Sequence, residues 1–410
     1  MFSDDRQSGR LGLVCMAICL LLVPILSGCA QATPTPEPAT ITFMLPEVDT
    51  EYYEALVAIF NESHPYVTVE LDNYQAEAGD VFSVSSFDLI ELLEQDAILN
   101  LDPFIENNES FDRSDFYPGI VDMFAAEGKT WAVPAGVDAM VMFYNQDLFD
   151  QYGVPYPDNE WTWDDFLTAG MGISHPDDNI FGYASTPLQP ADPILFIYQH
   201  GGRIFDDLHH PTRTTFDDPL TIEAVEWYVA LINDHNVAPT PEQARRAFGS
   251  SNEGVFRAIL QNKVGMWTGL FSDRGGMTWP VEWYMRWGML PLPRDAQAVS
   301  GGDVEGYVIS SQAEHPDACW LWVDFLSRQI PYRLVPARRS LAESDLFKQQ
   351  VGSAVAATVQ ASMDNMLLVS PDVAVFFPAL ATFYQAVEQA VVGNSTPGEA
   401  MRWAQEQAEQ

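Results

Sequence analysis

Residues 41–71 read ITFMLPEVDTEYYEALVAIFNESHPYVTVEL, and this stretch decides the fold class. Its first five residues form an apolar run that predicts a strand, and Asp49 or Thr50 can cap the helix that follows. That helix carries one apolar stripe, made of Tyr53, Leu56, Val57 and Phe60. His64-Pro65 ends it, and residues 67–71 alternate as a half-buried strand does. The pattern predicts two parallel strands joined by a right-handed helical crossover.

The same alternation of strands and helices continues along the chain. Helix starts are indicated by the capping-box spacing of Thr162 and Asp165, by Asp218 followed by Pro219, and by Pro316. A late helix runs over residues 380–391 and ends before Gly393. Further apolar strands are predicted over residues 139–143, 264–268 and 304–310. Alternating elements of this kind are typical of layered α/β proteins.

Length and charge limit the classes of function. The chain has 410 residues, enough for about two to three domains, and 47% of them are hydrophobic. Its 58 acidic and 19 basic residues give a formal net charge of −39. Such a chain repels phosphate backbones and anionic membrane surfaces, so nucleic-acid binding is excluded as its main role.

The first residues are typical of an export signal. Arg6 and Arg10 precede an uncharged run over residues 11–26, which is short for a membrane span. The run ends in Leu26-Ser27-Gly28-Cys29, which resembles the lipobox of bacterial lipoproteins. The resemblance implies a signal peptide over residues 1–28 and acyl chains on Cys29; the alternatives are an ordinary cleaved signal and a signal anchor. Residues 29–40 contain alternating Pro and small polar residues, which predicts a semi-rigid stalk.

The exported part shows no catalytic, cofactor or metal motif. After removal of the signal and lipidation of Cys29, only Cys319 remains, within an apolar helical pattern that favours a small buried side chain. Neither a P-loop, a G-x-G-x-x-G, a G-x-S-x-G nor an H-E-x-x-H sequence is present. His209-His210 lies in a polar loop, where surface exposure is the simpler interpretation than a metal site. We therefore expect neither enzyme activity nor a bound metal or cofactor.

Aromatic residues are abundant, with 11 Trp, 15 Tyr and 24 Phe. Most fall at core spacing, but one group falls at strand ends and in loops: Trp131, Trp161, Trp163, Trp267, Phe271, Trp279, Trp283 and Trp287. Flat aromatic faces beside a cleft suit the apolar faces of sugar rings, while carboxylates and amides bind sugar hydroxyls. Composition alone thus raises a carbohydrate-binding hypothesis, with core packing as its rival.

Several stretches, in the same order, resemble the extracellular solute-binding proteins of ABC sugar importers, the maltodextrin-binding group (family 1). The stretches are residues 52–71, 80–82, 99–105, 131–134, 142–149, 152–155, 161–166, 201–204, 262–266, 301–302, 307–310, 315–320 and 325–326. The resemblance covers nearly all of the chain after the stalk. Each stretch is a weak signal alone, and their joint order carries the identification.

The resemblance implies an α/β, two-lobed fold of the periplasmic-binding-protein type II, with a hinge between the lobes. We expect residues 41–137 plus 293–327 in the first lobe and residues 138–292 plus 328–410 in the second. A carbohydrate would bind between the lobes, closure would trap it, and the loaded form would dock on an ABC transporter permease. We expect a monomer, because lobe closure needs free rims, and the lipobox implies that a lipid anchor holds it at the outer face of the cytoplasmic membrane, in an extracellular or periplasmic position.

Candidate ligand-binding residues follow from the resemblance, position by position: Glu47, Phe87, Asp88, Asp138, Asp192, Trp267, Phe271, Asp303, Glu305, Tyr307 and Tyr384. Core packing remains open for Trp267 and for Tyr384, which completes an apolar stripe, and Asp138 can instead be a solvated or capping acid. The chain departs from the family pattern at residues 72–79, a segment that looks short and that no Trp follows.

Three other functions stay open. The same scaffold can bind a polyamine, a peptide or an organic anion, although an anion requires a basic cleft and the chain has only three Lys. A surface glycoside-processing enzyme needs two carboxyl groups at a set separation, which sequence cannot show. A sensory binding protein that feeds a membrane kinase has the same sequence features as an importer component.

Overall fold

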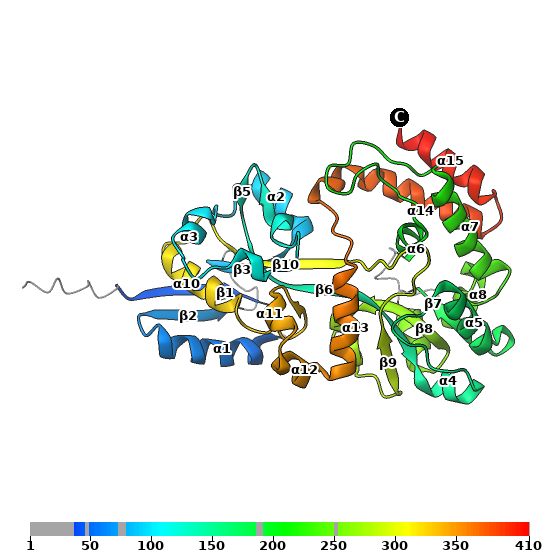
Figure 1. The fold of residues 1–410 in the computed structure, drawn as a ribbon, viewed down its shortest axis with the longest axis horizontal. Helices are drawn as coiled ribbons and strands as arrows, with labels where there is room; N and C mark the ends of the chain where they lie inside the picture. The colour runs from blue at the N-terminus through cyan, green and yellow to red at the C-terminus, as the bar shows by residue number, and fades with distance from the viewer. Residues whose placement is uncertain (1–36, 46–48, 73–78, 186–191, 250–252, 410) are drawn as a thin grey trace, which may run out of the picture. The chain divides into compact units, whose positions relative to one another are not determined.

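The computed structural model describes residues 37–45, 49–72, 79–185, 192–249 and 253–409 (Figure 1). Residues 1–28, predicted as a signal peptide, and Cys29, Glu47 and residues 73–78 lie outside them. The strands are β1 (Ala39–Met44), β2 (Val67–Asp72), β3 (Val81–Ser85), β4 (Ala125–Ala126), β5 (Lys129–Thr130), β6 (Val133–Asn145), β7 (Phe181–Ala184), β8 (Val264–Leu270), β9 (Trp287–Leu290), β10 (Gly302–Ile309) and β11 (Val335–Pro336). β1 thus begins at Ala39, inside the segment predicted as a stalk.

Helices alternate with these strands. The α-helices are α1 (Thr50–Ser63), α2 (Leu89–Glu94), α3 (Asp102–Glu106), α4 (Gln146–Tyr152), α5 (Trp163–Ile173), α6 (Asp192–His200), α7 (Pro219–Asn233), α8 (Pro241–Phe248), α9 (Glu253–Leu260), α10 (Pro316–Leu326), α11 (Arg339–Ala342), α12 (Asp345–Val351), α13 (Ser353–Asp364), α14 (Phe377–Val391) and α15 (Pro397–Ala408). Short 3-10 helices are η2 (Ser86–Asp88), η3 (Arg113–Asp115), η4 (Val121–Phe124), η5 (Pro176–Asp178), η6 (Phe271–Gly276) and η7 (Pro371–Phe376).

The first strand–helix–strand unit is as the sequence predicts. β1 and β2 pair in parallel, and α1 connects them with Leu56 and Phe60 buried. Two of the predicted caps are present: Thr162 and Asp165 form a capping box on α5, and Asp218 caps α7 ahead of Pro219. Asp49 lies at the N-cap of α1 but makes no side-chain hydrogen bond to the helix, because its carboxylate pairs with Arg333. Local chemistry therefore sets the starts of α5 and α7, because each cap satisfies backbone N–H groups that the helix leaves free.

The central sheet has the strand order β2-β1-β3-β10-β6-β8-β7. β6 is longer than the predicted strand over residues 139–143: it spans thirteen residues, all of them buried. Its first part pairs with β10 up to Ala139, and its second part pairs with β8 from Met140 onward. Figure 1 shows β6 and β10 running side by side through the middle of the described structure.

Two clusters of buried hydrophobic residues form the core, and β6 contributes to both. Val137, Ala139, Val141 and Phe143 pack into the first cluster, whereas Met140, Met142 and Tyr144 pack into the second. Because side chains alternate across a strand, one strand supplies both clusters. Cys319 is fully buried in the first cluster, as predicted.

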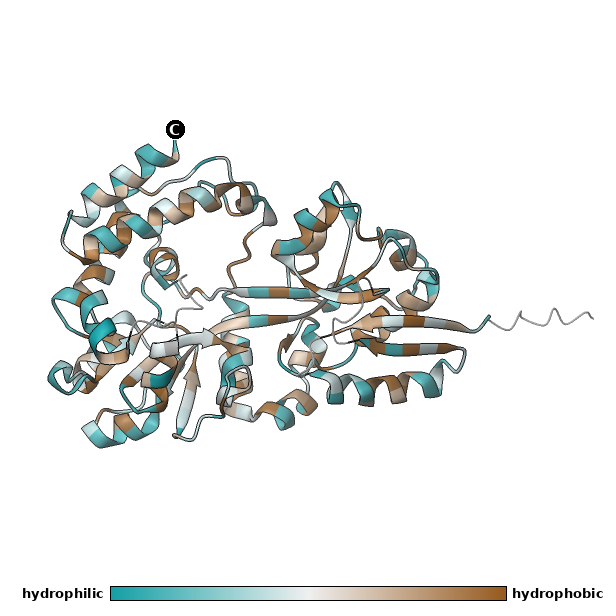
Figure 2. Ribbon diagram, turned by 180° about the vertical axis from the view of Figure 1, so that it is seen from behind, coloured by the Kyte–Doolittle hydropathy of each residue, from teal (hydrophilic) through white to brown (hydrophobic). Residues whose placement is uncertain are grey.

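Figure 2 shows hydrophilic and hydrophobic residues alternating along most helices, as expected for helices that cover a sheet with one face. Among the described residues, we found no helix with the length and apolar character needed to cross a bilayer.

Candidate functional site

Three carboxylates lie on one face of β6 and β10. Asp303 pairs directly with Asp138, and Glu305, two residues further along β10, pairs with Gly136. Opposite residues of an antiparallel pair share a face, as do residues two apart in a strand. The sequence predicted all three as ligand-binding residues, and the sheet register places them together.

Asp138 is the most enclosed of the three, with only 7% of its surface exposed. Its Oδ1 accepts a hydrogen bond of 2.9 Å from the backbone N–H of Ser272, at the start of η6. Burial raises the pKa of Asp138 to about 7, and the nearby carboxylates of Asp273 and Glu305 act in the same direction. Asp138 is therefore a carboxyl group whose charge changes close to neutral pH.

Asp303 and Glu305 are partly buried beside it. The Ser85 hydroxyl donates a hydrogen bond of 2.7 Å to Asp303, and burial together with the charge of Asp88 raises the pKa of Asp303. Burial also raises the pKa of Glu305, against the opposing effect of Arg333. Raised pKa values are common where a protein gathers like charges for binding or chemistry.

Two arginines border this face, and both are already engaged. Arg333 forms a two-pronged ion pair with the buried Asp49, with contacts of 3.0 and 2.8 Å. Arg274 donates to the carbonyl oxygens of Phe271, Tyr332 and Arg333, and its guanidinium stacks on the ring of Phe271 at 3.9 Å. We did not predict these arginines or Asp49 as ligand-binding residues; Asp49 was predicted only as a possible helix cap.

Tyr307 lies on β10, and Phe87 follows β3, the strand that pairs with β10. The Tyr307 hydroxyl is 3.2 Å from that of Tyr53, beside a cavity of about 20 Å³ that Glu305 and Arg333 also line. Phe87 and Asp88 lie in η2, directly after β3, and both are exposed. Phe87 offers 39% of its surface to solvent.

Trp267 and Phe271 are fully buried. The Trp267 ring stacks on Phe143 with centroids 5.9 Å apart and meets Trp283 edge-on at 5.2 Å. In the structure described here, neighbouring aromatic rings and Arg274 cover these two side chains, so neither offers a free face to a solute. Trp161, Trp163 and Trp283 are buried as well, which favours core packing, the rival interpretation, for these residues.

Asp192 and Tyr384 form a separate group. Asp192 opens α6 and is 2% exposed; its Oδ2 accepts a hydrogen bond from the Tyr183 hydroxyl, while its Oδ1 has no hydrogen-bond partner among the described residues. Burial raises the pKa of Asp192, and burial together with the charge of Asp192 raises the pKa of Tyr384. Among the described residues, this pair makes no hydrogen bond or ion pair with Asp138, Asp303 or Glu305.

A comparison with known protein families shows the family to which the chain belongs. The sequence profile of bacterial extracellular solute-binding proteins matches residues 46–329, more than half of the chain. The chain belongs to the bacterial extracellular solute-binding proteins. This family membership agrees with the resemblance inferred from the order of the sequence motifs.

Individual members of this solute-binding family are distant from the chain. A binding protein of Brucella abortus is 20% identical over 293 residues, which cover 67% of this chain and 68% of the relative. An arabinooligosaccharide-binding protein of Halalkalibacterium halodurans is 28% identical over 118 residues, covering 28% of this chain and 25% of the relative.

Solved structures share the fold. An ABC substrate-binding protein from Listeria monocytogenes, in complex with cycloalternan, aligns over 91% of this chain and 98% of its own with a TM-score of 0.73 and 20% identity. A maltose-bound protein from T. maritima aligns over 90% of this chain and 99% of its own with a TM-score of 0.68 and 17% identity. The solute-binding protein described here therefore has the α/β, two-lobed fold of periplasmic binding proteins.

Proposed function

We propose that this protein is a lipid-anchored solute-binding protein that captures a carbohydrate between its two lobes and delivers it to an ABC importer. Family membership supports solute capture outside the cell. The carbohydrate is supported by relatives and neighbours, which include an arabinooligosaccharide-binding protein, a mannitol-binding protein and proteins solved with cycloalternan and maltose.

The observation that carries the proposal is the carboxylate face of Asp138, Asp303 and Glu305. It lies at the place where β6 stops pairing with β10 and starts pairing with β8. Ionised carboxylates are strong acceptors for hydroxyl groups, and a polyhydroxylated solute presents several donors at once. The buried position of Asp138 keeps water from competing for those hydrogen bonds.

The proposed mechanism needs no chemistry on the solute. A solute that contacts Asp303 on β10 and Ser272 on η6 at the same time stabilises the closed form by its greater affinity for that form. Under this proposal, Asp192, Tyr384, Phe87, Asp88, Tyr307 and Glu47 line other parts of the same site, while residues 41–137 plus 293–327 and residues 138–292 plus 328–410 are the two lobes. Acyl chains on Cys29 would hold a monomer at the outer face of the cytoplasmic membrane, where it reaches the permease.

A sugar panel tests the proposal. We expect one mono- or oligosaccharide to raise the melting temperature and change tryptophan fluorescence, and to be recovered unchanged by mass spectrometry. A flat response across the panel contradicts carbohydrate binding, and new reducing ends contradict a non-enzymatic role. Mass spectrometry of small molecules that co-purify with the protein names the solute directly.

A cationic solute such as a polyamine is a second candidate, and the same face favours it. Three carboxylates lie together there. The guanidinium of Arg333 pairs with Asp49, and that of Arg274 donates its hydrogen bonds to backbone carbonyl oxygens. The uncompensated negative charge would attract an ammonium group. Spermidine belongs in the panel, and binding of spermidine without any sugar would favour this candidate.

A further inference from the structure

Three stretches of the chain have the sequence Asn-x-Ser/Thr in which the middle residue is not Pro. They are Asn61-Glu62-Ser63, Asn108-Glu109-Ser110 and Asn394-Ser395-Thr396. In an exported protein, this sequence is an acceptor for N-linked glycans. Because the protein belongs to a family of extracellular proteins, each of the three asparagines is a candidate acceptor. The structure distinguishes between them.

Asn108 lies in the turn that follows α3, and Ser110 fixes its side chain. The backbone N–H and the hydroxyl of Ser110 both donate hydrogen bonds to Oδ1 of Asn108, at 3.1 and 2.7 Å. Nδ2 of Asn108 has no hydrogen-bond partner among the described residues, so this nitrogen is available. Hydrogen bonds to an amide oxygen stabilise negative charge on that oxygen, which makes it easier to remove a proton from the amide nitrogen.

Arg328, which follows α10, holds Ser110 from the other side. Its guanidinium donates to the hydroxyl oxygen of Ser110 at 3.1 Å and to the carbonyl oxygen of Ser110 at 3.0 Å, across 218 positions. It also pairs with Asp324 at 2.9 Å. Because a guanidinium can only donate, the Ser110 hydroxyl accepts from Arg328 and gives its own hydrogen to Asn108. The end of α10 therefore keeps the turn in this arrangement.

The turn is accessible from solvent. Asn107, Glu109 and Ser110 are exposed, and Asn108 is half-buried. Residues 107–110 and α3 form one wall of a cavity of about 650 Å³, and α10 forms the other wall. This cavity leaves space beside Asn108 for a sugar.

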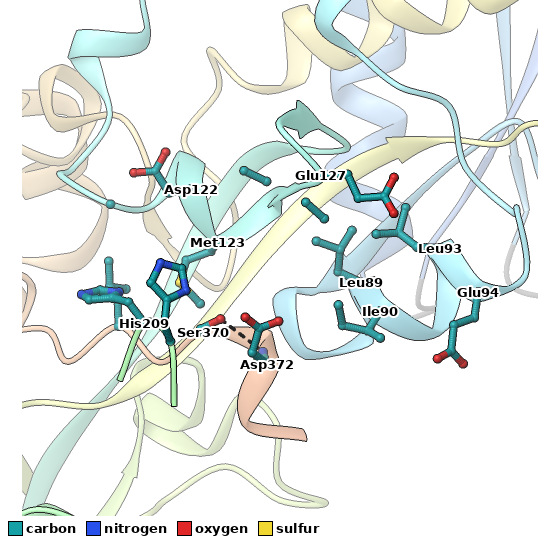
Figure 3. A pocket seen from close by; sticks show the side chains of 15 residues that line it. Leu89, Ile90, Leu93, Glu94, Asp122, Met123, Glu127, His209, Ser370 and Asp372 are labelled. Atoms are coloured by element: carbon teal, nitrogen blue, oxygen red, sulfur yellow. Dashed lines mark hydrogen bonds between the residues drawn. The ribbon is translucent and has the colours of Figure 1, made fainter. Parts of the chain in front are cut away.

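The turn is also separate from the solute site. A cavity of about 790 Å³, drawn in Figure 3, has walls from residues 89–94 and 119–127 and from residues 209–210 and 368–372. The proposed function assigns these walls to different lobes, so that cavity belongs to the solute cleft. None of residues 106–110 lines it. A glycan on Asn108 would therefore leave solute capture unobstructed.

The other two asparagines lack this arrangement. Asn61 lies within α1, and its Oδ1 is buried with no hydrogen-bond partner among the described residues. The hydroxyl of Ser63 donates instead to a backbone carbonyl oxygen of the same helix. Nδ2 of Asn394 donates to Gln389 at 2.7 Å, and the hydroxyl of Thr396 takes part in the capping box of α15. In neither case does the hydroxyl two positions later contact the asparagine.

We propose that Asn108 is an N-glycosylation site, with a lipid-pyrophosphate-linked oligosaccharide as the donor and a membrane-bound transferase as the catalyst. Nδ2 of Asn108 forms a bond to C1 of the first sugar. The bond between C1 and the pyrophosphate oxygen breaks, and the lipid pyrophosphate leaves with that electron pair. The proton released from Nδ2 passes to a carboxylate of the transferase. The modification requires export but does not depend on which solute the protein captures.

Glycosylation of the folded full chain tests the proposal. The chain is incubated with a bacterial oligosaccharyltransferase and its lipid-linked oligosaccharide, and its mass is measured after denaturation, which removes any solute bound without a covalent bond. We expect the mass of one glycan, on the peptide that contains Asn108. Asn108→Gln and Ser110→Ala should lose it, whereas Ser110→Thr keeps the hydroxyl and should retain it. The matched controls Asn107→Gln and Asn394→Gln, both at exposed positions, should be glycosylated like the parent.

A synthetic peptide of residues 103–113 is the acceptor control. A glycan on the peptide but not on the folded chain would show that the folded turn is not an acceptor. An unmodified peptide, with a transferase that modifies its standard acceptor, would show that the sequence is not one. Glycosylation of the folded chain at Asn61 or Asn394, or an unchanged yield in Ser110→Ala, would also overturn the proposal. A flat response to the sugar panel would contradict the proposed function and leave this test unchanged.

Discussion

The backbone N–H of Ser272 donates a hydrogen bond to the carboxylate of Asp138 at 2.9 Å, although 134 positions separate the two residues. Asp138 lies on β6 just before the pairing partner changes from β10 to β8, and Ser272 lies directly after β8. The contact therefore fixes a buried carboxylate where β6 changes its pairing partner.

Stability should fall as the pH rises from about 4 to about 7, and Asp138 should account for part of that fall. Its pKa lies near 3.8 in the unfolded chain and is raised to about 7 by burial, so the folded state binds more protons in this range. The contribution of Asp138 is full below pH 4 and is lost as the pH passes 7, with a slope of up to about 1.4 kcal/mol per pH unit. Urea unfolding of the parent and Asp138→Asn at several pH values measures it. Identical slopes in the two proteins would contradict the assignment.

Asp138→Asn should weaken solute binding by about tenfold or more. The amide keeps the size of the side chain but loses the charge, and a hydrogen bond to a charged group contributes about 1.5–3 kcal/mol. Titration calorimetry with the solute found in the panel provides the measurement. Asp234→Asn, at an exposed position after α7, is the matched control and should bind like the parent. An unchanged affinity in Asp138→Asn would remove this carboxylate from the site.

Arg333→Met should destabilise the protein by about 2–4 kcal/mol, because Asp49 would keep a charge in a buried place without its partner. Adding Asp49→Asn in the same chain should recover part of the loss, since the unpaired charge is then gone. Chemical denaturation of the two single variants and the double variant measures the coupling. Strictly additive losses would show that the ion pair contributes nothing by itself.

Trp267→Ala should lower the free energy of unfolding by about 3–5 kcal/mol, as expected for a large aromatic residue in a packed core. The milder Trp267→Phe should lose less stability and keep the solute affinity of the parent. Trp403→Ala, at a partly exposed position on α15, should cost less than about 1 kcal/mol. If Trp267→Phe abolished binding at unchanged stability, Trp267 would be a ligand contact and not a core residue.

Local sequence was enough for much of the fold. The apolar stripe of α1, the capping box of Thr162 and Asp165 and the Pro at the start of α10 are all found where the sequence predicts them. Caps and periodic stripes act over a few residues, so they can be recognised in one sequence without a fold. Motif order extended this to the family, which the profile match confirms.

The site depended on longer-range information. The family resemblance could nominate Asp138, Asp303 and Glu305, but only the antiparallel register places Asp303 opposite Asp138. The engagement of Arg333 by Asp49, across 284 positions, leaves no trace in local sequence. In the same way, a tryptophan at a strand end can face a cleft or the core. The ring contacts with Phe143 and Trp283 show that Trp267 faces the core.

By itself, the sequence determined the secondary structure, the family and the types of side chain available for binding, because these depend on local chemistry and on motif order. The tertiary structure alone decided which carboxylates share a face, which arginines are already paired and which aromatic rings are buried. These properties come from strand register and from packing between distant segments, whose energies depend on neighbours that are remote in the chain.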